Sequence, residues 1–128
     1  MVKILVVEDD ASVRHATRMV LEGAGHQVLE AVNGMGVEAV VQEHQPDLVL
    51  TDMLMPDRDG VETVLALRRR YPRLPIIAMS GGGKRGYLDL RMVKRLGAWA
   101  TLDKPFDGEK LNHLIRDVLA GPPPEETP

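Results

Sequence analysis

The fold is indicated first by two segments, KILVVEDD at residues 3–10 and LVLTD at residues 48–52. Each is a short apolar run that ends in acidic side chains, which predicts a strand covered on both faces with polar groups at its end. The acids are Glu8, Asp9 and Asp10 after the first run and Asp52 after the second. Because the carboxyl ends of parallel strands lie along one edge of a sheet, we expect these side chains to share one pocket.

Outward from these two stretches, short apolar runs alternate with longer segments of helical period. This alternation is typical of an α/β fold, a doubly wound parallel sheet of five strands. The predicted strands are Lys3–Val7, Gln27–Ala31, Leu48–Thr51, Pro75–Met79 and Ala98–Leu102. We expect the second of them at an edge of the sheet.

Five apolar stripes predict the helices between and after these strands. They are Val13, Ala16, Thr17, Val20 and Leu21; Val37, Val40 and Val41; Val61, Val64 and Leu65; Leu88, Met92 and Leu96; and Leu111, Leu114, Ile115 and Val118. Gly23 or Gly25 is expected to end the first helix and Gly97 the fourth, in left-handed caps. Asn33 is the predicted N-cap of the second helix.

Length and composition favour one globular domain at residues 1–120, followed at 121–128 by a proline-rich tail or truncated linker. The chain has 128 residues, of which 44% are hydrophobic and 27% charged. A net charge of -3 provides no basic field for direct nucleic-acid binding. The absence of cysteine excludes disulfides and thiolate zinc sites. The first apolar run is too short for a signal sequence or membrane span, so a cytoplasmic protein is expected.

The predicted pocket has the donors of a magnesium and phosphoryl site. Its carboxylates require a cation, and Lys104, after the fifth strand, supplies one positive charge. Oxygen donors without cysteine or histidine suit Mg²⁺, beside which Asp52 is a candidate nucleophile toward phosphorus. Ser80 follows the fourth strand, where its hydroxyl can reach a phosphoryl oxygen. The alternative for each acid taken alone is a solvated loop residue.

Four sequence features together resemble the receiver domain of two-component response regulators, in particular the single-domain chemotaxis type. They are ILVVEDD at residues 4–10, DMLMPDRDG at residues 52–60, Ser80, and KPF at residues 104–106. The resemblance extends over Met1–Ala120. It implies the strand order 2-1-3-4-5 and a phosphorylation-dependent switch, not an enzyme, that receives its phosphoryl group from a histidine kinase or phosphotransfer protein. The output partner is not identified by the sequence.

The resemblance also implies a role for each matching residue. Asp52 would accept the phosphoryl group. Mg²⁺ would be bound by Asp52, by Asp9 directly, by Glu8 through water and by the Leu54 carbonyl. In the same way Ser80 would be the switch hydroxyl and Lys104 the phosphate-binding lysine, and the Lys104–Pro105 bond would be cis. Asp10 has no role in this pattern.

The sequence departs from the family pattern at the position three residues before Lys104. The family usually has an aromatic switch residue there, whereas this chain has Thr101. Trp99, two residues earlier, is expected on the same side of the strand and is a hypothetical part of an output surface with Ser80 and Thr101. The alternative for Trp99 is ordinary packing against the fourth helix.

Two other functions compete with the receiver interpretation. A magnesium-dependent phosphatase would also use Asp52 as a nucleophile, but it needs a second carboxylate to activate water, and Leu54 provides none. The segment GMGVEA at residues 34–39 fits a dinucleotide-binding pattern. It follows the second strand instead of the first, so its glycines are better explained by a turn.

Overall fold

The structure is a computed structural model that describes residues 2–53, 60–80 and 90–121. Strands and helices alternate along these ranges. The strands are β1 (Lys3–Val7), β2 (Gln27–Ala31), β3 (Leu48–Asp52), β4 (Ile76–Ser80) and β5 (Ala100–Asp103). The helices are α1 (Ala11–Gly23), α2 (Val37–His44), α3 (Gly60–Arg70), α4 (Leu90–Leu96) and α5 (Gly108–Leu119). None of these helices is both long and apolar enough to cross a membrane.

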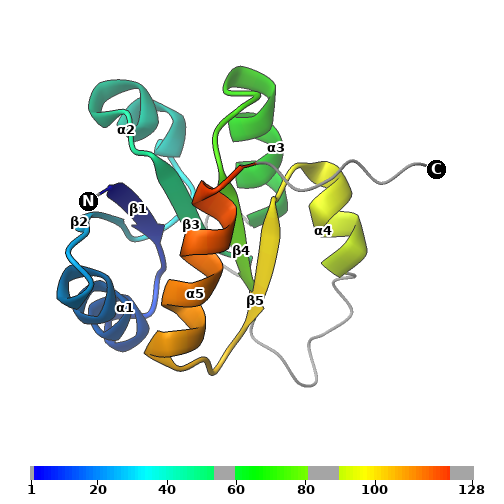
Figure 1. The fold of residues 1–128 in the computed structure, drawn as a ribbon. Coiled ribbons are helices and arrows are strands. Elements are labelled where there is room, and N and C mark those ends of the chain that lie inside the picture. The colour runs from blue at the N-terminus through cyan, green and yellow to red at the C-terminus, as the bar shows by residue number, and fades with distance from the viewer. Residues whose placement is uncertain (1, 54–59, 81–89, 122–128) are drawn as a thin grey trace.

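The strands form one parallel sheet in the order β2-β1-β3-β4-β5. This confirms the predicted fold class and strand order, with β2 at one edge. Figure 1 shows the sheet between two layers of helices. Helices α1 and α5 pack on one face, and α2, α3 and α4 pack on the other.

The core follows from the two-residue period of the strands. In β1, Ile4 and Val6 belong to the cluster formed with α1 and α5, whereas Leu5 and Val7 belong to the cluster formed with α2, α3 and α4. All four side chains are fully buried. Burial of each such side chain contributes about 1.5–3 kcal/mol, which explains why a strand covered on both faces is apolar throughout.

The observed strand ends differ from the predicted ones by one or two residues. β3 and β4 each continue one residue further, so Asp52 and Ser80 are the last residues of their strands. β4 begins after Pro75, because proline has no N–H with which to donate a hydrogen bond to a neighbouring strand. β5 begins at Ala100. The Ala98 N–H bonds to the Val93 carbonyl at the end of α4, and the Trp99 N–H bonds to the Ile76 carbonyl of β4.

The predicted cap of α2 is wrong. Its N-cap is Gly36, which has a left-handed φ of 75°. Asn33 instead accepts a hydrogen bond from the Met35 N–H at 2.7 Å, which closes a turn before the helix. The glycine interpretation of GMGVEA is therefore consistent with the observed turn, and Gly25 and Gly97 have the left-handed φ values predicted for the residues after α1 and α4. Leu88, in the predicted fourth helix, lies outside the described residues.

Candidate functional site

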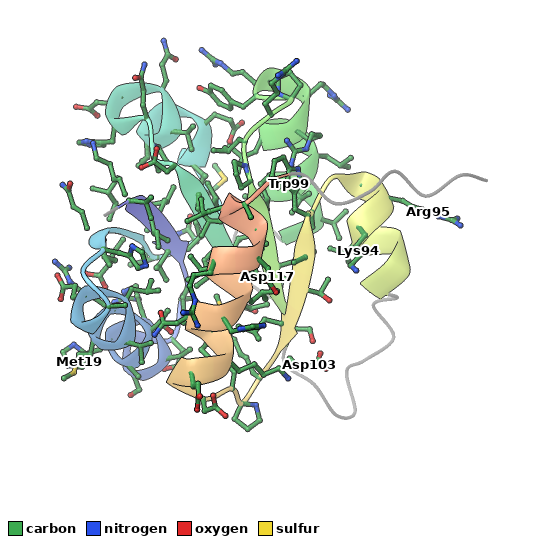
Figure 2. The ribbon with its side chains drawn as sticks, in the orientation of Figure 1. Met19, Lys94, Arg95, Trp99, Asp103 and Asp117 are labelled. Atoms are coloured by element: carbon green, nitrogen blue, oxygen red, sulfur yellow. The ribbon has the colours of Figure 1, made fainter. Side chains whose placement is uncertain are left out.

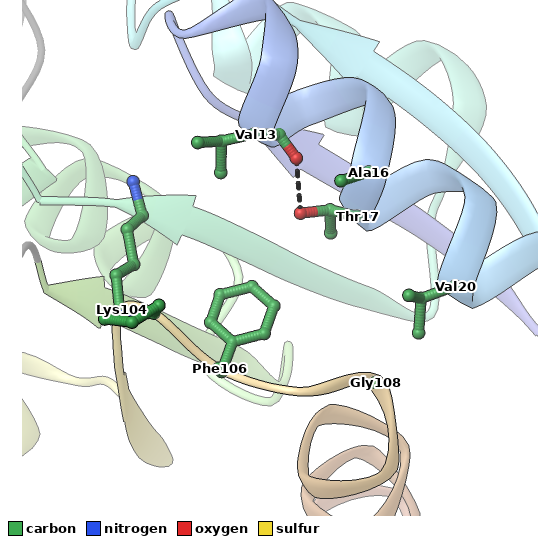
Figure 3. A pocket seen from close by; sticks show the side chains of 8 residues that line it. Val13, Ala16, Thr17, Val20, Lys104, Phe106 and Gly108 are labelled. Carbon is green, nitrogen blue, oxygen red and sulfur yellow. Dashed lines mark hydrogen bonds between the residues drawn. The ribbon is translucent and has the colours of Figure 1, made fainter.

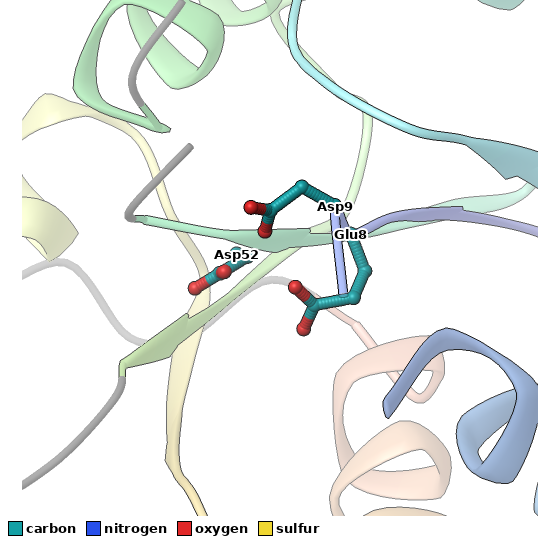
Figure 4. Close-up of side chains that lie close together, drawn as sticks. All are labelled: Glu8, Asp9 and Asp52. Carbon is teal, nitrogen blue, oxygen red and sulfur yellow. The ribbon is translucent and has the colours of Figure 1, made fainter. Parts of the chain in front are cut away.

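The ends of β1 and β3 bring the first acidic residues together. The two strands pair in register, with Val7 opposite Thr51, so Glu8 and Asp52 follow at the same edge of the sheet. Glu8 and Asp9 leave β1 there, and Figure 4 shows their carboxyl groups beside that of Asp52. The predicted convergence of these three acids is therefore present in the fold.

The three acids form a compact set of oxygen donors. One carboxylate oxygen from each of Glu8, Asp9 and Asp52 lies within 4.8 Å of the others. Glu8 is fully buried and Asp52 is 5% exposed, whereas Asp9 is exposed to solvent. A hard cation with several water ligands fits such a set, because the three carboxylate oxygens converge and Asp9 is exposed to solvent.

Lys104 reaches this cluster from the end of β5. Its Nζ contacts Glu8 Oε1 and lies 3.3 Å from Asp52 Oδ2. The Lys104 side chain is only 18% exposed, so these ion pairs are partly shielded from water. The Lys104–Pro105 peptide bond is cis, in agreement with what the family resemblance implies.

The electrostatic balance of the pocket changes two pKa values. Burial raises the pKa of the Glu8 carboxyl from 4.5 to about 7; the Lys104 hydrogen bond opposes this rise, and Asp52 adds to it. Burial alone would lower the pKa of Lys104. The hydrogen bond to Glu8 and the charges of Asp52 and Glu8 outweigh burial and raise that pKa above its usual value. Lys104 is therefore charged at neutral pH.

The expectation that Asp10 shares the pocket with the other three acids is wrong, because its side chain caps α1 instead. Its Oδ1 accepts hydrogen bonds from the Ser12 and Val13 N–H groups, at 2.9 and 3.2 Å, and so caps the N-terminus of α1. Arg14, one turn later, donates to the Glu8 carbonyl at 2.8 Å and to Glu30 at 3.0 Å. Helix α1 thus fixes the backbone at the mouth of the pocket.

Ser80 occupies the predicted position, but its hydroxyl has a partner that the sequence did not indicate. Ser80 Oγ donates to Asp103 Oδ1 at 2.9 Å, and the Ser80 carbonyl accepts from the Lys104 N–H at 2.8 Å. The second bond couples the end of β4 to the lysine that enters the pocket. Leu54, the remaining predicted site residue, lies outside the described residues.

Thr101 and Trp99 differ in their surroundings. Thr101 is half-buried in β5, opposite Ala78 of β4. Trp99 precedes the regular strand, so the two-residue period does not place it beside Thr101. Trp99 (Figure 2) packs against the core cluster on the α1 and α5 face. The Arg68 guanidinium lies 6.0 Å from its ring centroid.

A groove of about 340 Å³ adjoins the pocket between α1 and the segment that follows β5. Figure 3 shows Val13 and Val20 of α1 on one side of it and Phe106 on the other, with Lys104 at one end. Within α1, the Thr17 hydroxyl donates to the Val13 carbonyl at 2.7 Å, so the groove presents mainly apolar atoms. Lys104 is therefore shared by this groove and the acidic cluster.

Comparisons with known proteins give one consistent result. Residues 4–116 match the response regulator receiver domain. The virulence transcriptional regulatory protein PhoP of Salmonella typhimurium is 32% identical over 119 residues, which are 93% of this chain and 52% of PhoP. This chain thus spans about half the length of that relative. Sporulation initiation phosphotransferase F of Bacillus subtilis is 32% identical over 118 residues, which are 91% of this chain and 93% of that protein.

A solved structure agrees in fold as well as in sequence. The chemotaxis response regulator CheY4 of Vibrio cholerae superimposes with a TM-score of 0.82 and 31% identity. The match covers 92% of this chain and 98% of CheY4. The strand order, the acidic edge of the sheet and these similarities lead to one assignment. The chain belongs to the response regulator receiver domain family.

Proposed function

We propose that Asp52 is the residue through which this receiver domain is switched, by accepting a phosphoryl group. The observation that carries the proposal is the position of Asp52, which is almost buried at the end of β3, within 4.8 Å of the Glu8 and Asp9 oxygens and 3.3 Å from Lys104 Nζ. An Asp52 oxygen forms a bond to phosphorus as the bond from phosphorus to the donor breaks. With a phosphohistidine donor, the released imidazole takes up a proton.

The donor set is also the basis for proposing Mg²⁺ as the cofactor. Receiver domains bind Mg²⁺ at an acidic pocket, and Glu8, Asp9 and Asp52 are the residues here that would hold it. When bound, the ion neutralises charge on the phosphoryl oxygens. Lys104 provides the protein's own positive charge at the same place.

Two side chains beside Asp52 are proposed to convert phosphorylation into a change of conformation. A shift from 1:99 to 99:1 between two states requires about 5.5 kcal/mol of differential binding. Hydrogen bonds to charged groups each contribute about 1.5–3 kcal/mol. Contacts of Ser80 and Lys104 with one phosphoryl group together approach this requirement, whereas neither reaches it alone.

Receiver domains interact with histidine kinases and phosphotransfer proteins, and we propose such a protein as the donor here. The apolar groove supports this proposal, because Lys104 lines it and also contacts Asp52. A helix docked on the groove would lie next to the acceptor. Ala16→Arg, at an exposed position in the groove, should slow transfer from the protein donor and leave labelling by acetyl phosphate unchanged. Equal slowing with both donors would contradict this docking site.

A switch and a phosphatase differ in stoichiometry. We expect acetyl phosphate with Mg²⁺ to add one phosphoryl group per chain, measured by intact mass, and EDTA to prevent the labelling. Release of many equivalents of p-nitrophenol from p-nitrophenyl phosphate would instead favour a phosphatase. The output partner of the phosphorylated form is proposed to bind near β5, where Thr101 and Trp99 are partly exposed.

A further inference from the structure

The ends of β4 and β5 hold a polar pair that belongs to neither the metal cluster nor the phosphoryl acceptor. Ser80 and Asp103 are register partners in the last positions of the two strands. Their side chains are joined by the bond from Ser80 Oγ to Asp103 Oδ1, at 2.9 Å. Asp103 is exposed, on the edge of the sheet at which β5 ends (Figure 2).

A serine hydroxyl has one proton to donate. In this structure Asp103 accepts that proton, so the same proton is not available to another acceptor. The backbone beside the pair is already fixed by the bond from the Lys104 N–H to the Ser80 carbonyl. A change of acceptor therefore requires only a rotation of the Ser80 side chain about its first torsion angle.

Stability of the fold is a weak explanation for this pair. Asp103 is exposed, and a hydrogen bond at such a site competes with water and adds little to the free energy of unfolding. A role in switching explains the pair better, because Ser80 is the hydroxyl for which a phosphoryl oxygen would be the competing acceptor.

We propose that Asp103 is a positioning residue that holds the Ser80 hydroxyl in the unphosphorylated state and competes with the phosphoryl group for its proton. This inference rests on the proposed phosphorylation of Asp52. In this proposal Asp103, which precedes Lys104, stabilises the unphosphorylated state. Removal of Asp103 should then make the phosphorylated arrangement easier to reach.

The experiment is a titration with beryllofluoride, which mimics a phosphoryl group on a carboxylate, in the presence of Mg²⁺. The ¹H–¹⁵N NMR signals of the Ser80 and Lys104 amides report the beryllofluoride concentration at which half of the protein is bound, which is the midpoint of the titration. Asp103→Ala should lower the midpoint about two- to tenfold, the factor that corresponds to one hydrogen bond. Asp103→Asn, which keeps an acceptor without the charge, should fall between wild type and Asp103→Ala.

The Ser80→Ala background separates the hydrogen bond from simple charge repulsion. In that background Asp103→Ala should leave the midpoint unchanged. Asp117 is an exposed acid of α5, and Asp117→Ala in the wild-type background should also leave the midpoint unchanged. An equal decrease with and without Ser80, or no decrease in either background, would overturn the role of Asp103. A wild-type protein that binds no beryllofluoride would overturn the proposed function itself.

Discussion

Lys104 Nζ lies 3.3 Å from Asp52 Oδ2 and also contacts the fully buried carboxylate of Glu8. One cation therefore balances two acids that come from different strands. A phosphoryl group on Asp52 would compete with Glu8 for this cation.

Glu8 should make the metal-free protein less stable as pH rises. The ordinary pKa of a glutamate carboxyl is 4.5, and burial raises the pKa of Glu8 in the folded protein to about 7, so the unfolded chain loses this proton first as pH rises. The stabilisation is complete below pH 4.5 and is lost as pH rises through 7, by up to about 3 kcal/mol. The difference in urea unfolding free energy between wild type and Glu8→Gln, measured in EDTA, should fall across this range. A difference that does not vary with pH would show that burial does not raise the pKa of Glu8.

Lys104→Met should destabilise the protein more at pH 8 than at pH 5. At pH 8 the substitution leaves Glu8 buried without its cation, and loss of one partner of a buried pair costs about 3–5 kcal/mol. At pH 5 a proton on Glu8 reduces this cost. Lys110→Met, at an exposed position of α5, is the matched control and should change stability by less than about 0.5 kcal/mol. An equal loss of stability at both pH values would argue against the Lys104–Glu8 ion pair as the cause.

Gly60→Ala should disturb the end of β3. A Cβ at Gly60 would lie 2.4 Å from the Met53 Cα and 2.7 Å from the Asp52 carbonyl oxygen, so the backbone at Asp52 and Met53 must move. We expect a loss of about 1–3 kcal/mol in thermal or urea unfolding. Gly23→Ala is the control because its Cβ meets nothing within 4 Å, and it should stabilise by about 0.4–1 kcal/mol. If Gly60→Ala did not change the stability, the start of α3 would have to move enough to accommodate the added Cβ without cost.

Arg68 should be important for stability although it lies in a run of three arginines. Its guanidinium donates to the carbonyls of Gly97, Tyr71 and Leu74 and so ties α3 to the turn before β5. Arg68→Leu removes these bonds and should cost about 3 kcal/mol in urea unfolding. Arg69→Leu, at the exposed neighbouring position, should change stability by no more than about 0.5 kcal/mol. Similar effects of both substitutions would contradict this assignment.

The sequence predicts those features of the site that depend on strand order and period. Apolar runs such as that of β1 show that a strand is buried on both faces, and parallel strands must end at one edge. These two facts place Glu8, Asp9, Asp52 and Lys104 at one edge of the sheet, and the strand order then makes β1 and β3 neighbours there. The assignment of strand order came from resemblance to a known family, because periodicity does not specify neighbours.

The parts that sequence reasoning missed depend on side-chain rotamers and on exact strand limits. The hydrogen bond between Ser80 and Asp103 forms because these residues lie opposite each other in β4 and β5. The identities of the two residues do not indicate that pairing. The wrong placement of Trp99 came from a strand that was predicted to begin two residues early. Asn33 was taken as a helix cap because asparagine favours both caps and turns, and only the structure shows which it forms.

The identity of the acceptor is tested most directly by intact-mass measurement of three proteins treated with acetyl phosphate and Mg²⁺. Wild type and Asp117→Asn, the latter altered at an exposed acid of α5, should each gain one phosphoryl group. Asp52→Asn should gain none while giving an NMR spectrum of the folded protein. Labelling of Asp52→Asn to the level of wild type would contradict the assignment of Asp52 as the acceptor.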